Sequence, residues 1–234
     1  LLLRPHHNST LRMSQEQQVD PARQAAVEKV QAAFMEFDAE KKGAIASSNF
    51  AAVLAKLGYT GFTPKILANA ESIVDLEGSG EIAFGTFLWF YDMLTHAVTL
   101  FNGKATNGRV ASAEIGGLLT AMGYTSLAPR TVTGLQTLTD PTHSGSFDYN
   151  ALVTTLLFIR FALNLFGSAD AEGKGHLTFQ QMEGLLPNLN IHGASPQQAK
   201  VIFDTHDLDK SGTMDPFEFI DLALTLKFPQ LAQH

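Results

Sequence analysis

The chain has 234 residues, enough for one large domain or two to three small ones, and its hydrophobic content of 45% can fill a core. Its formal net charge of −7, without any run of basic residues, argues against a nucleic-acid partner, because nothing would track the phosphates. The sequence has no cysteine, which excludes disulfides, thiolate metal sites and a cysteine nucleophile and favours an intracellular location, cytoplasmic or cytoskeletal.

Residues 1–19 are predicted to be an N-terminal extension, either transit-like or disordered. The segment contains Arg4 and Arg12 and has no acidic residue before Glu16. This composition resembles the end of an organellar transit segment, which makes a mitochondrial location the alternative to a cytoplasmic or cytoskeletal one. The other interpretation is an artefact upstream of Met13.

Prolines mark the expected starts of several helices. Asp20-Pro21 predicts the start of the first helix, because Asp caps a helix and Pro suits its first turn. Three later prolines, Pro64, Pro129 and Pro196, follow at separations of 65 and 67 residues, and each precedes a helical stretch. This regular spacing indicates an internal repeat.

A polar loop with glycine at its sixth position follows each of these three stretches, and a similar loop lies before each proline. The loops, numbered first to sixth, begin at residues 38, 75, 103, 140, 170 and 207. The spacing is 37 residues within each pair and 28 or 30 between pairs. Position 8 is apolar in every loop: Ile45, Ile82, Val110, Phe147, Leu177 and Met214. We therefore expect the loops to pair one-two, three-four and five-six through short antiparallel ribbons.

The short spacing between pairs predicts shared helices. A 12-residue loop leaves only 16 or 18 residues before the next pair begins, which is one helix of about 24 Å. The two most apolar windows, Phe87–Phe101 and Ala151–Phe166, lie at these junctions. Both are shorter than the roughly 20 residues of a spanning helix, and each carries a charged residue, so no transmembrane span is predicted.

The sixth loop has the full ligand pattern of a calcium loop. Such a loop needs oxygen ligands at positions 1, 3 and 5, glycine at 6, a carbonyl at 7 and a bidentate Glu at 12, with a water-mediated ligand at 9. The predicted metal ligands are Asp207, Asp209, Ser211, Thr213, Asp215 and Glu218. Asp215, Pro216 and Glu218 also form a predicted capping box for the following helix.

These residues resemble the EF-hand, a helix, a calcium loop and a second helix, and the resemblance extends over roughly residues 21–228. It implies an all-α fold of six EF-hand units in three pairs, with shared helices that resemble the penta-EF-hand arrangement. The expected divisions are 20–98, 99–163 and 164–228, followed by a tail at 229–234. The resemblance implies Ca²⁺ as the cofactor, with Mg²⁺ as an alternative at rest.

The other five loops are degenerate. Position 12 carries Asn49, Thr86, Glu114, Ala151 and Gln181, so only the third loop retains a carboxylate there. The third loop has Gly103 and Ala105 at positions 1 and 3, and the first and fifth have Lys42 and Lys174 at position 5, where calcium would lie. The second loop is the next candidate for weak cation binding, through Asp75, Glu77, Ser79 and Glu81.

No enzyme motif is present, since the sequence lacks Gly-x-Ser-x-Gly, a phosphate-binding glycine loop and His-Glu-x-x-His. His143 and His206 are interpreted as solvated loop residues. Two functions stay open. The first is a calcium-responsive regulator that changes its affinity for a partner protein, a helix for example, through the C-terminal hand. The second is a largely metal-independent structural subunit of a cytoskeletal or organellar assembly.

Overall fold

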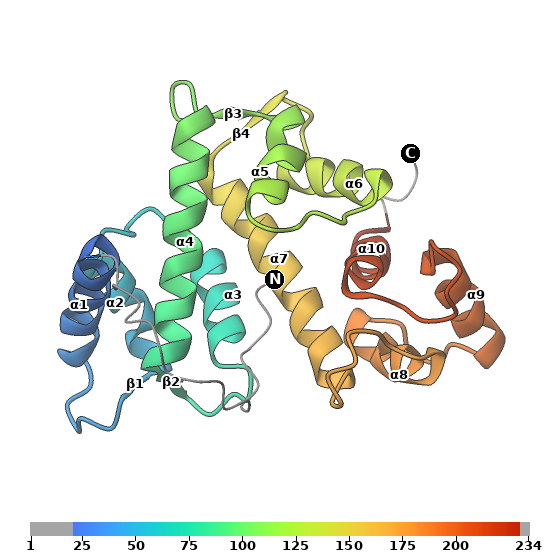
Figure 1. Ribbon diagram of the computed structural model, residues 1–234, viewed down its shortest axis with the longest axis horizontal. Helices are drawn as coiled ribbons and strands as arrows, with labels where there is room; N and C mark the ends of the chain where they lie inside the picture. The colour runs from blue at the N-terminus through green and yellow to red at the C-terminus, as the bar shows by residue number, and fades with distance from the viewer. Residues whose placement is uncertain (1–20, 230–234) are drawn as a thin grey trace, which may run out of the picture. The chain divides into compact units, whose positions relative to one another are not determined.

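The computed structural model describes residues 21–229 (Figure 1). The predicted extension at 1–19, the cap at Asp20 and most of the tail therefore lie outside the described residues. The chain divides after Thr95 into two compact units, residues 1–95 and 96–234. Each unit is described by itself below, and the division by loop pairs stays a prediction.

Unit 1 contains the first two loops. Its elements, in chain order, are α1 (Pro21–Met35), β1 (Ala44–Ala46), η1 (Ser47–Asn49), α2 (Phe50–Lys56), α3 (Pro64–Val74), β2 (Glu81–Ala83) and the first half of α4 (Phe84–Lys104). Aromatic rings form its core: Phe87 lies 5.5 Å from Phe34 and 5.9 Å from Phe50, and Phe90 lies 5.3 Å from Phe50 (ring centroids). Trp89 lies beside Phe90, with 6.3 Å between the ring centroids.

Unit 2 contains the other four loops. After the rest of α4 come β3 (Val110–Ala111), η2 (Ser112–Glu114), α5 (Ile115–Ala121), α6 (Pro129–Thr139), β4 (Ser146–Phe147), α7 (Tyr149–Ala169), α8 (Phe179–Leu185), η3 (Leu186–Leu189), α9 (Pro196–His206) and α10 (Pro216–Lys227). One hydrophobic cluster extends from Ala97 to Leu224. Within it α10 packs against α6, α7 and α9.

Helix starts follow the predicted pattern. Pro64, Pro129 and Pro196 each occupy the first position of a helix, where the missing N–H costs no hydrogen bond. The side chain of Thr63 accepts a hydrogen bond from the first turn of α3, and Ser195 forms a capping box at α9. Because helices dominate residues 21–229 and the strands are two or three residues long, the predicted all-α class is confirmed.

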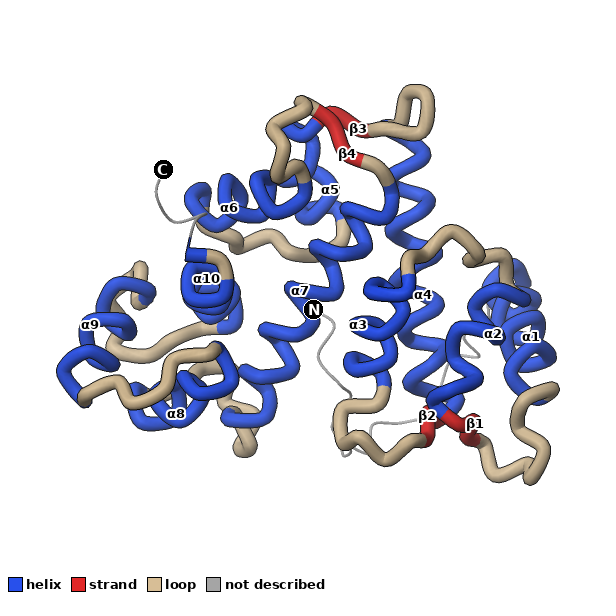
Figure 2. Tube along the Cα trace, turned by 180° about the vertical axis from the view of Figure 1, so that it is seen from behind, coloured by secondary structure: helices blue, strands red, loops and turns tan. Residues whose placement is uncertain are grey.

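The loops pair through position 8 as predicted. Figure 2 shows the β1–β2 and β3–β4 ribbons. Ile45 lies opposite Ile82 in the first and Val110 lies opposite Phe147 in the second, while Leu177 and Met214 form an isolated bridge. All six residues are at most 1% exposed. The glycine at position 6 has a φ between +73° and +83° in every loop, a conformation that a Cβ would strain.

Both shared helices form, but each is longer than predicted. The helices α4 and α7 have 21 residues each, about 31 Å rather than 24 Å. The estimate was wrong because position 10 of a loop already begins the helix, as at Phe84 and Tyr149. The helix α7 is long and apolar enough to cross a membrane, yet half of its most apolar window is buried within the protein, as in a core helix.

Candidate metal centre

The sixth loop connects the end of α9 at His206 to the start of α10 at Pro216. The carboxylate of Asp207, at position 1, accepts hydrogen bonds from the backbone N–H groups of Ser211 (3.0 Å) and Gly212 (2.9 Å). Gly212 has a φ of +80°, which turns the chain back toward Asp207. The loop is thus folded around its first carboxylate.

Three carboxylates meet in this loop. One oxygen each of Asp207, Asp209 and Glu218 lie within 4.8 Å of one another. Calcium–oxygen distances are about 2.3–2.6 Å, so two ligands of one ion are at most about 5 Å apart. The three side chains therefore fit a single Ca²⁺ ion. Without a cation their charges repel one another, which favours binding further.

Glu218 is in the first turn of α10, and its side chain extends back over the sixth loop. Its Oε1 accepts a hydrogen bond from Leu208 N (2.7 Å) and its Oε2 from Asp215 N (2.9 Å). Burial raises the pKa of Glu218, whereas hydrogen bonds from Ser211 lower the pKa of Asp209. The bidentate position thus lies over the loop, close to the carboxylates with which it would share an ion.

The remaining predicted ligands have other partners as well. Ser211 Oγ, at position 5, donates to the carbonyl oxygen of Thr213 (3.0 Å), which is the position-7 ligand. Asp215 Oδ1 accepts hydrogen bonds from Phe217 N (2.7 Å) and Glu218 N (2.8 Å), which completes the predicted capping box. Asp215 therefore lies outside the three-carboxylate cluster and acts here as a helix cap.

The weaker candidate ligands of the second loop do not come together into a group that could hold one metal ion. Asp75 accepts hydrogen bonds from Ser79 N, Ser79 Oγ and Gly80 N, all between 2.8 and 2.9 Å. Glu81 instead pairs with Lys42 of the first loop, and Glu77 is exposed. Across residues 21–229, a group of three or more carboxylate or imidazole side chains close enough for one metal occurs only in the sixth loop.

In the second and fourth loops, the carboxylate at position 1 also accepts a hydrogen bond from a serine of the paired loop. Ser47 Oγ donates to Asp75 (2.8 Å) and Ser112 Oγ donates to Asp140 (2.6 Å). Both serines are at position 10 of the preceding loop. The fifth loop has Phe179 at this position, packed against the ring of Phe203 and without a hydroxyl to donate.

The sequence interpretation did not recognise these cross-loop serines. The signal was present, because position 10 is serine in the first and third loops and phenylalanine in the fifth. They explain why the position-1 carboxylates of the second and fourth loops are satisfied by hydrogen bonds. The pKa of Asp140 is strongly lowered, first of all by its hydrogen bond from Ser112.

The third loop differs from its predicted geometry. Gly103, its expected first position, lies within α4, and the chain turns through a two-residue hairpin at Asn107-Gly108 between Thr106 and Arg109. Asn-Gly favours this turn because both residues tolerate a positive φ. The retained carboxylate of Glu114 pairs with Lys104. This loop therefore does not form the 12-residue arrangement assumed for it.

Lysine side chains of the first and fifth loops pair with glutamates. Lys42 contacts Glu40 and Glu81, and Lys174 contacts Glu172. Both lysines are partly exposed, and Glu40 and Glu172 stand at position 3 of the same loops, so each ammonium group neutralises a carboxylate at a ligand position. His143 is exposed as expected, whereas His206 is only 4% exposed, because it lies against Asp221 of α10.

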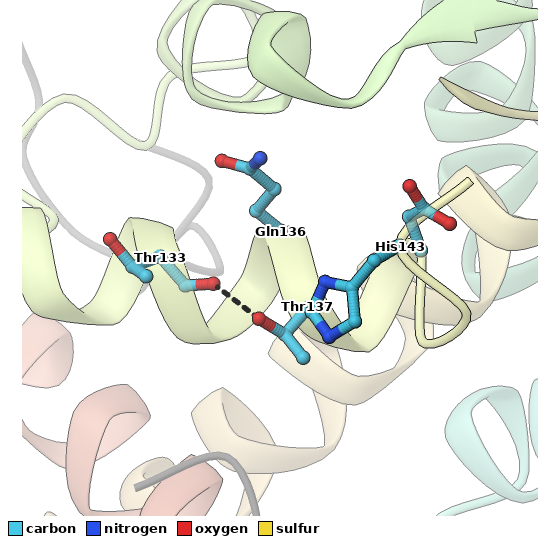
Figure 3. Close-up of a pocket in the computed structure, with 5 residues that line it drawn as sticks. Thr133, Gln136, Thr137 and His143 are labelled. Atoms are coloured by element: carbon cyan, nitrogen blue, oxygen red, sulfur yellow. Dashed lines mark hydrogen bonds between the residues drawn. The ribbon is translucent and has the colours of Figure 1, made fainter. Parts of the chain in front are cut away.

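A surface hollow of about 300 Å³ adjoins the fourth loop (Figure 3). It is lined by Thr133, Gln136, Thr137, Asp140 and His143. The view shows the ring of His143 beside Thr137, whose hydroxyl donates to the carbonyl of Thr133 (3.2 Å). Asp140 is the one carboxylate in this lining, and it accepts hydrogen bonds from the hydroxyls of Ser112 and Ser144.

Comparisons with known proteins add little to this geometry. No family model matches the chain, and no curated protein matches it. Among solved structures, a homologue of programmed cell death 6 protein from Leishmania major Friedlin is similar over 66% of this chain and 86% of its own, with 24% identity and a TM-score of 0.44. A redox protein from Chlamydomonas reinhardtii is similar over 62% of this chain and 51% of its own, with 20% identity and a TM-score of 0.33. Both TM-scores are below 0.5, so neither likeness supports a functional argument.

Proposed function

We propose that the protein is a non-catalytic calcium-binding protein of EF-hand type with one principal metal site. The observation that carries this proposal is the meeting of three carboxylates in the sixth loop. Asp207, Asp209 and Glu218 would hold the ion, assisted by Ser211 and the carbonyl of Thr213. Six to eight oxygens are typical of calcium, so water would complete the shell. Mg²⁺ is the alternative occupant at rest.

The function proposed for this site is calcium-responsive regulation of a partner protein. Glu218 lies in the first turn of α10, so an ion bound through it acts directly on that helix. Movement of α10 would change the apolar surface offered by the C-terminal hand and so its affinity for a partner helix. The proposed location is intracellular, cytoplasmic or cytoskeletal, with a mitochondrial one as the alternative.

A second role, a structural subunit of a large assembly, is favoured by a different observation. The first two loop pairs are closed by hydrogen bonds in place of a metal: Ser47 bonds to Asp75, and Ser112 bonds to Asp140. Loops closed in this way would hold their helices at a fixed angle whatever the calcium concentration. In this role the first four loops would bind a partner constitutively.

Calcium titration by calorimetry on Glu218→Gln tests the metal site. The wild-type protein should bind one Ca²⁺, and the variant should bind on the order of 100-fold more weakly, because a neutral amide replaces the bidentate carboxylate. Glu114→Gln is the matched control: it removes a carboxylate from position 12 of the third loop, where Lys104 is the partner. Its calcium affinity should equal that of the wild type.

Absence of binding heat at millimolar calcium in the wild type would contradict the proposal. An equal loss of calcium affinity in Glu218→Gln and Glu114→Gln would contradict it too. Capture of partners from cell extract, with and without calcium, then separates the two roles. A regulator loses a partner when calcium is removed or when Glu218 is replaced. A structural subunit retains the same partners in all of these conditions.

A further inference from the structure

A polar cluster joins three helices of unit 2 next to the sixth loop: it is built around a buried carboxylate, and its arginine, Arg130, is partly exposed. At its centre is Asp221 of α10, which is 3% exposed. Its carboxylate accepts hydrogen bonds from Arg130 Nε (2.9 Å) and Thr131 Oγ1 (2.7 Å) of α6, and it lies 2.7 Å from His206 Nδ1 at the end of α9. We call these four residues the Asp221 cluster. None of them is a predicted metal ligand.

The Asp221 cluster flanks the metal loop on both sides. His206 immediately precedes Asp207. Asp221 follows Glu218 by three residues, so the side chains of Glu218 and Asp221 are neighbours along α10. Arg130 contacts both flanks: its guanidinium bonds to Asp221 on α10 and donates to the carbonyl of Thr205 on α9 (3.0 Å). One side chain of α6 therefore connects the two helices that hold the loop.

Packing one turn further along α10 strengthens this connection. Leu224 lies so close to α6 that a Cβ added at Gly134 would come within 2.6 Å of its Cδ2 atom. Leu224 is 3% exposed. The missing side chain at Gly134 thus allows α10 to approach the backbone of α6, and the position of α10 is fixed at two points.

Asp221 is charged at neutral pH despite its burial. Burial alone would raise the pKa of Asp221, but hydrogen bonds from His206, Arg130 and Thr131 outweigh this effect and lower the pKa to about 2. A buried carboxylate that loses such a partner becomes strongly unfavourable. Removal of Arg130 should therefore allow α10 to shift toward solvent.

We propose that Arg130, before the fourth loop, is a positioning residue for the calcium site: it holds α9 and α10 at the separation at which Asp207, Asp209 and Glu218 meet. This inference rests on the proposed calcium site in the sixth loop. Because coupling between two sites is reciprocal, calcium binding tightens the contact of α10 with α6. The metal state of the sixth loop is thereby transmitted to the helix that precedes the fourth.

The test compares Arg130→Met with Arg109→Met in the full chain, by calorimetric titration with Ca²⁺. Both variants lose one positive charge, but Arg109 bonds to Ser146 of β4, within the β3–β4 ribbon. We expect Arg130→Met to bind calcium about 10-fold more weakly, which is typical of coupling between sites, and Arg109→Met to bind within twofold of the wild type. Circular dichroism of the metal-free variants checks that they fold.

Hydrogen exchange supplies a readout that a general loss of stability would not reproduce. Calcium should slow amide exchange in residues 129–139 of the wild type and of Arg109→Met, but not of Arg130→Met. If Arg130→Met fails to fold, Arg130→Gln serves instead, since it removes the charge from the contact with Asp221 but keeps a polar side chain. A loss of about threefold in calcium affinity is then expected.

The outcomes are distinguishable. If the wild type binds calcium and Arg130→Met, or Arg130→Gln in its place, binds it equally well, the positioning role of Arg130 is wrong while the calcium site stands. If the wild type itself binds no calcium, both proposals fail. Equal weakening in Arg109→Met and Arg130→Met would show a general effect of charge and would overturn the inference.

Discussion

Single residues at position 10 decide how the first carboxylate of the neighbouring loop is satisfied. Ser47 and Ser112 donate hydroxyl hydrogens to Asp75 and Asp140, whereas the fifth loop offers the ring of Phe179 to the core. A carboxylate that already has its hydrogen bonds gains less from a cation. The choice between serine and phenylalanine therefore separates loops closed by hydrogen bonds from the loop that gathers its carboxylates.

Ser112→Ala tests this role at the residue scale. The variant removes a donor from the buried carboxylate of Asp140 and should lower the free energy of unfolding by about 1–3 kcal/mol. Urea unfolding followed by circular dichroism measures the change. Ser168→Ala is the control, since its hydroxyl bonds to the carbonyl of Leu165 on an exposed helix surface, and the change there should stay within about 0.5 kcal/mol. Equal stability of Ser112→Ala and wild type would contradict the role given to the serine.

At the scale of elements, local signals were enough to predict most of the fold. Pro64, Pro129 and Pro196 begin helices because proline suits the first turn, and the glycine at position 6 fixes each loop turn. The apolar residue at position 8 then gives the register of the ribbons. All of these signals act within a few residues, so they can be read without knowledge of the tertiary structure.

Other features depend on contacts between distant residues and were missed. Asp221 appears in the sequence as an ordinary helix residue, but Arg130, which bonds to it, is 91 positions away. The burial of His206 follows from its own contact with Asp221, 15 positions further along the chain. The predicted capping role of Asp215 is confirmed, because one carboxylate oxygen satisfies two free N–H groups of α10, and its role as a water-mediated ligand stays a prediction. Asn107-Gly108, by contrast, was a readable hairpin signal that the repeat pattern obscured.

The aromatic packing of α4 provides a test at the scale of one element. Phe87→Ala removes a fully buried ring between Phe34 and Phe50 and should cost about 3–5 kcal/mol of folding free energy in unit 1. Hydrogen exchange should accelerate in α1 and α2. Phe87→Leu, which leaves a smaller cavity, should cost less. Since the carboxylate cluster lies in unit 2, calcium affinity should not change, and a large change would contradict this separation.

For the whole molecule, the position of the carboxylate cluster predicts that calcium stabilises unit 2 and leaves unit 1 unchanged. At a calcium concentration 100 times the dissociation constant, the stability of unit 2 should rise by about 2.7 kcal/mol, and a chelator should reverse the gain. Hydrogen exchange should slow in α9 and α10 and stay unchanged in residues 44–83. Slower exchange in residues 75–83 would instead indicate that the second loop binds calcium too.

Trp89 is the single tryptophan of the sequence, and its packing beside Phe90 has a consequence for spectroscopy. Its emission reports on the surroundings of α4 in unit 1, while the carboxylate cluster lies in unit 2. An unchanged emission spectrum after calcium addition is therefore compatible with a fully loaded site. Tyr124 and Tyr149 are the tyrosines of unit 2, so excitation that includes tyrosine adds an intrinsic signal from the unit that holds the cluster.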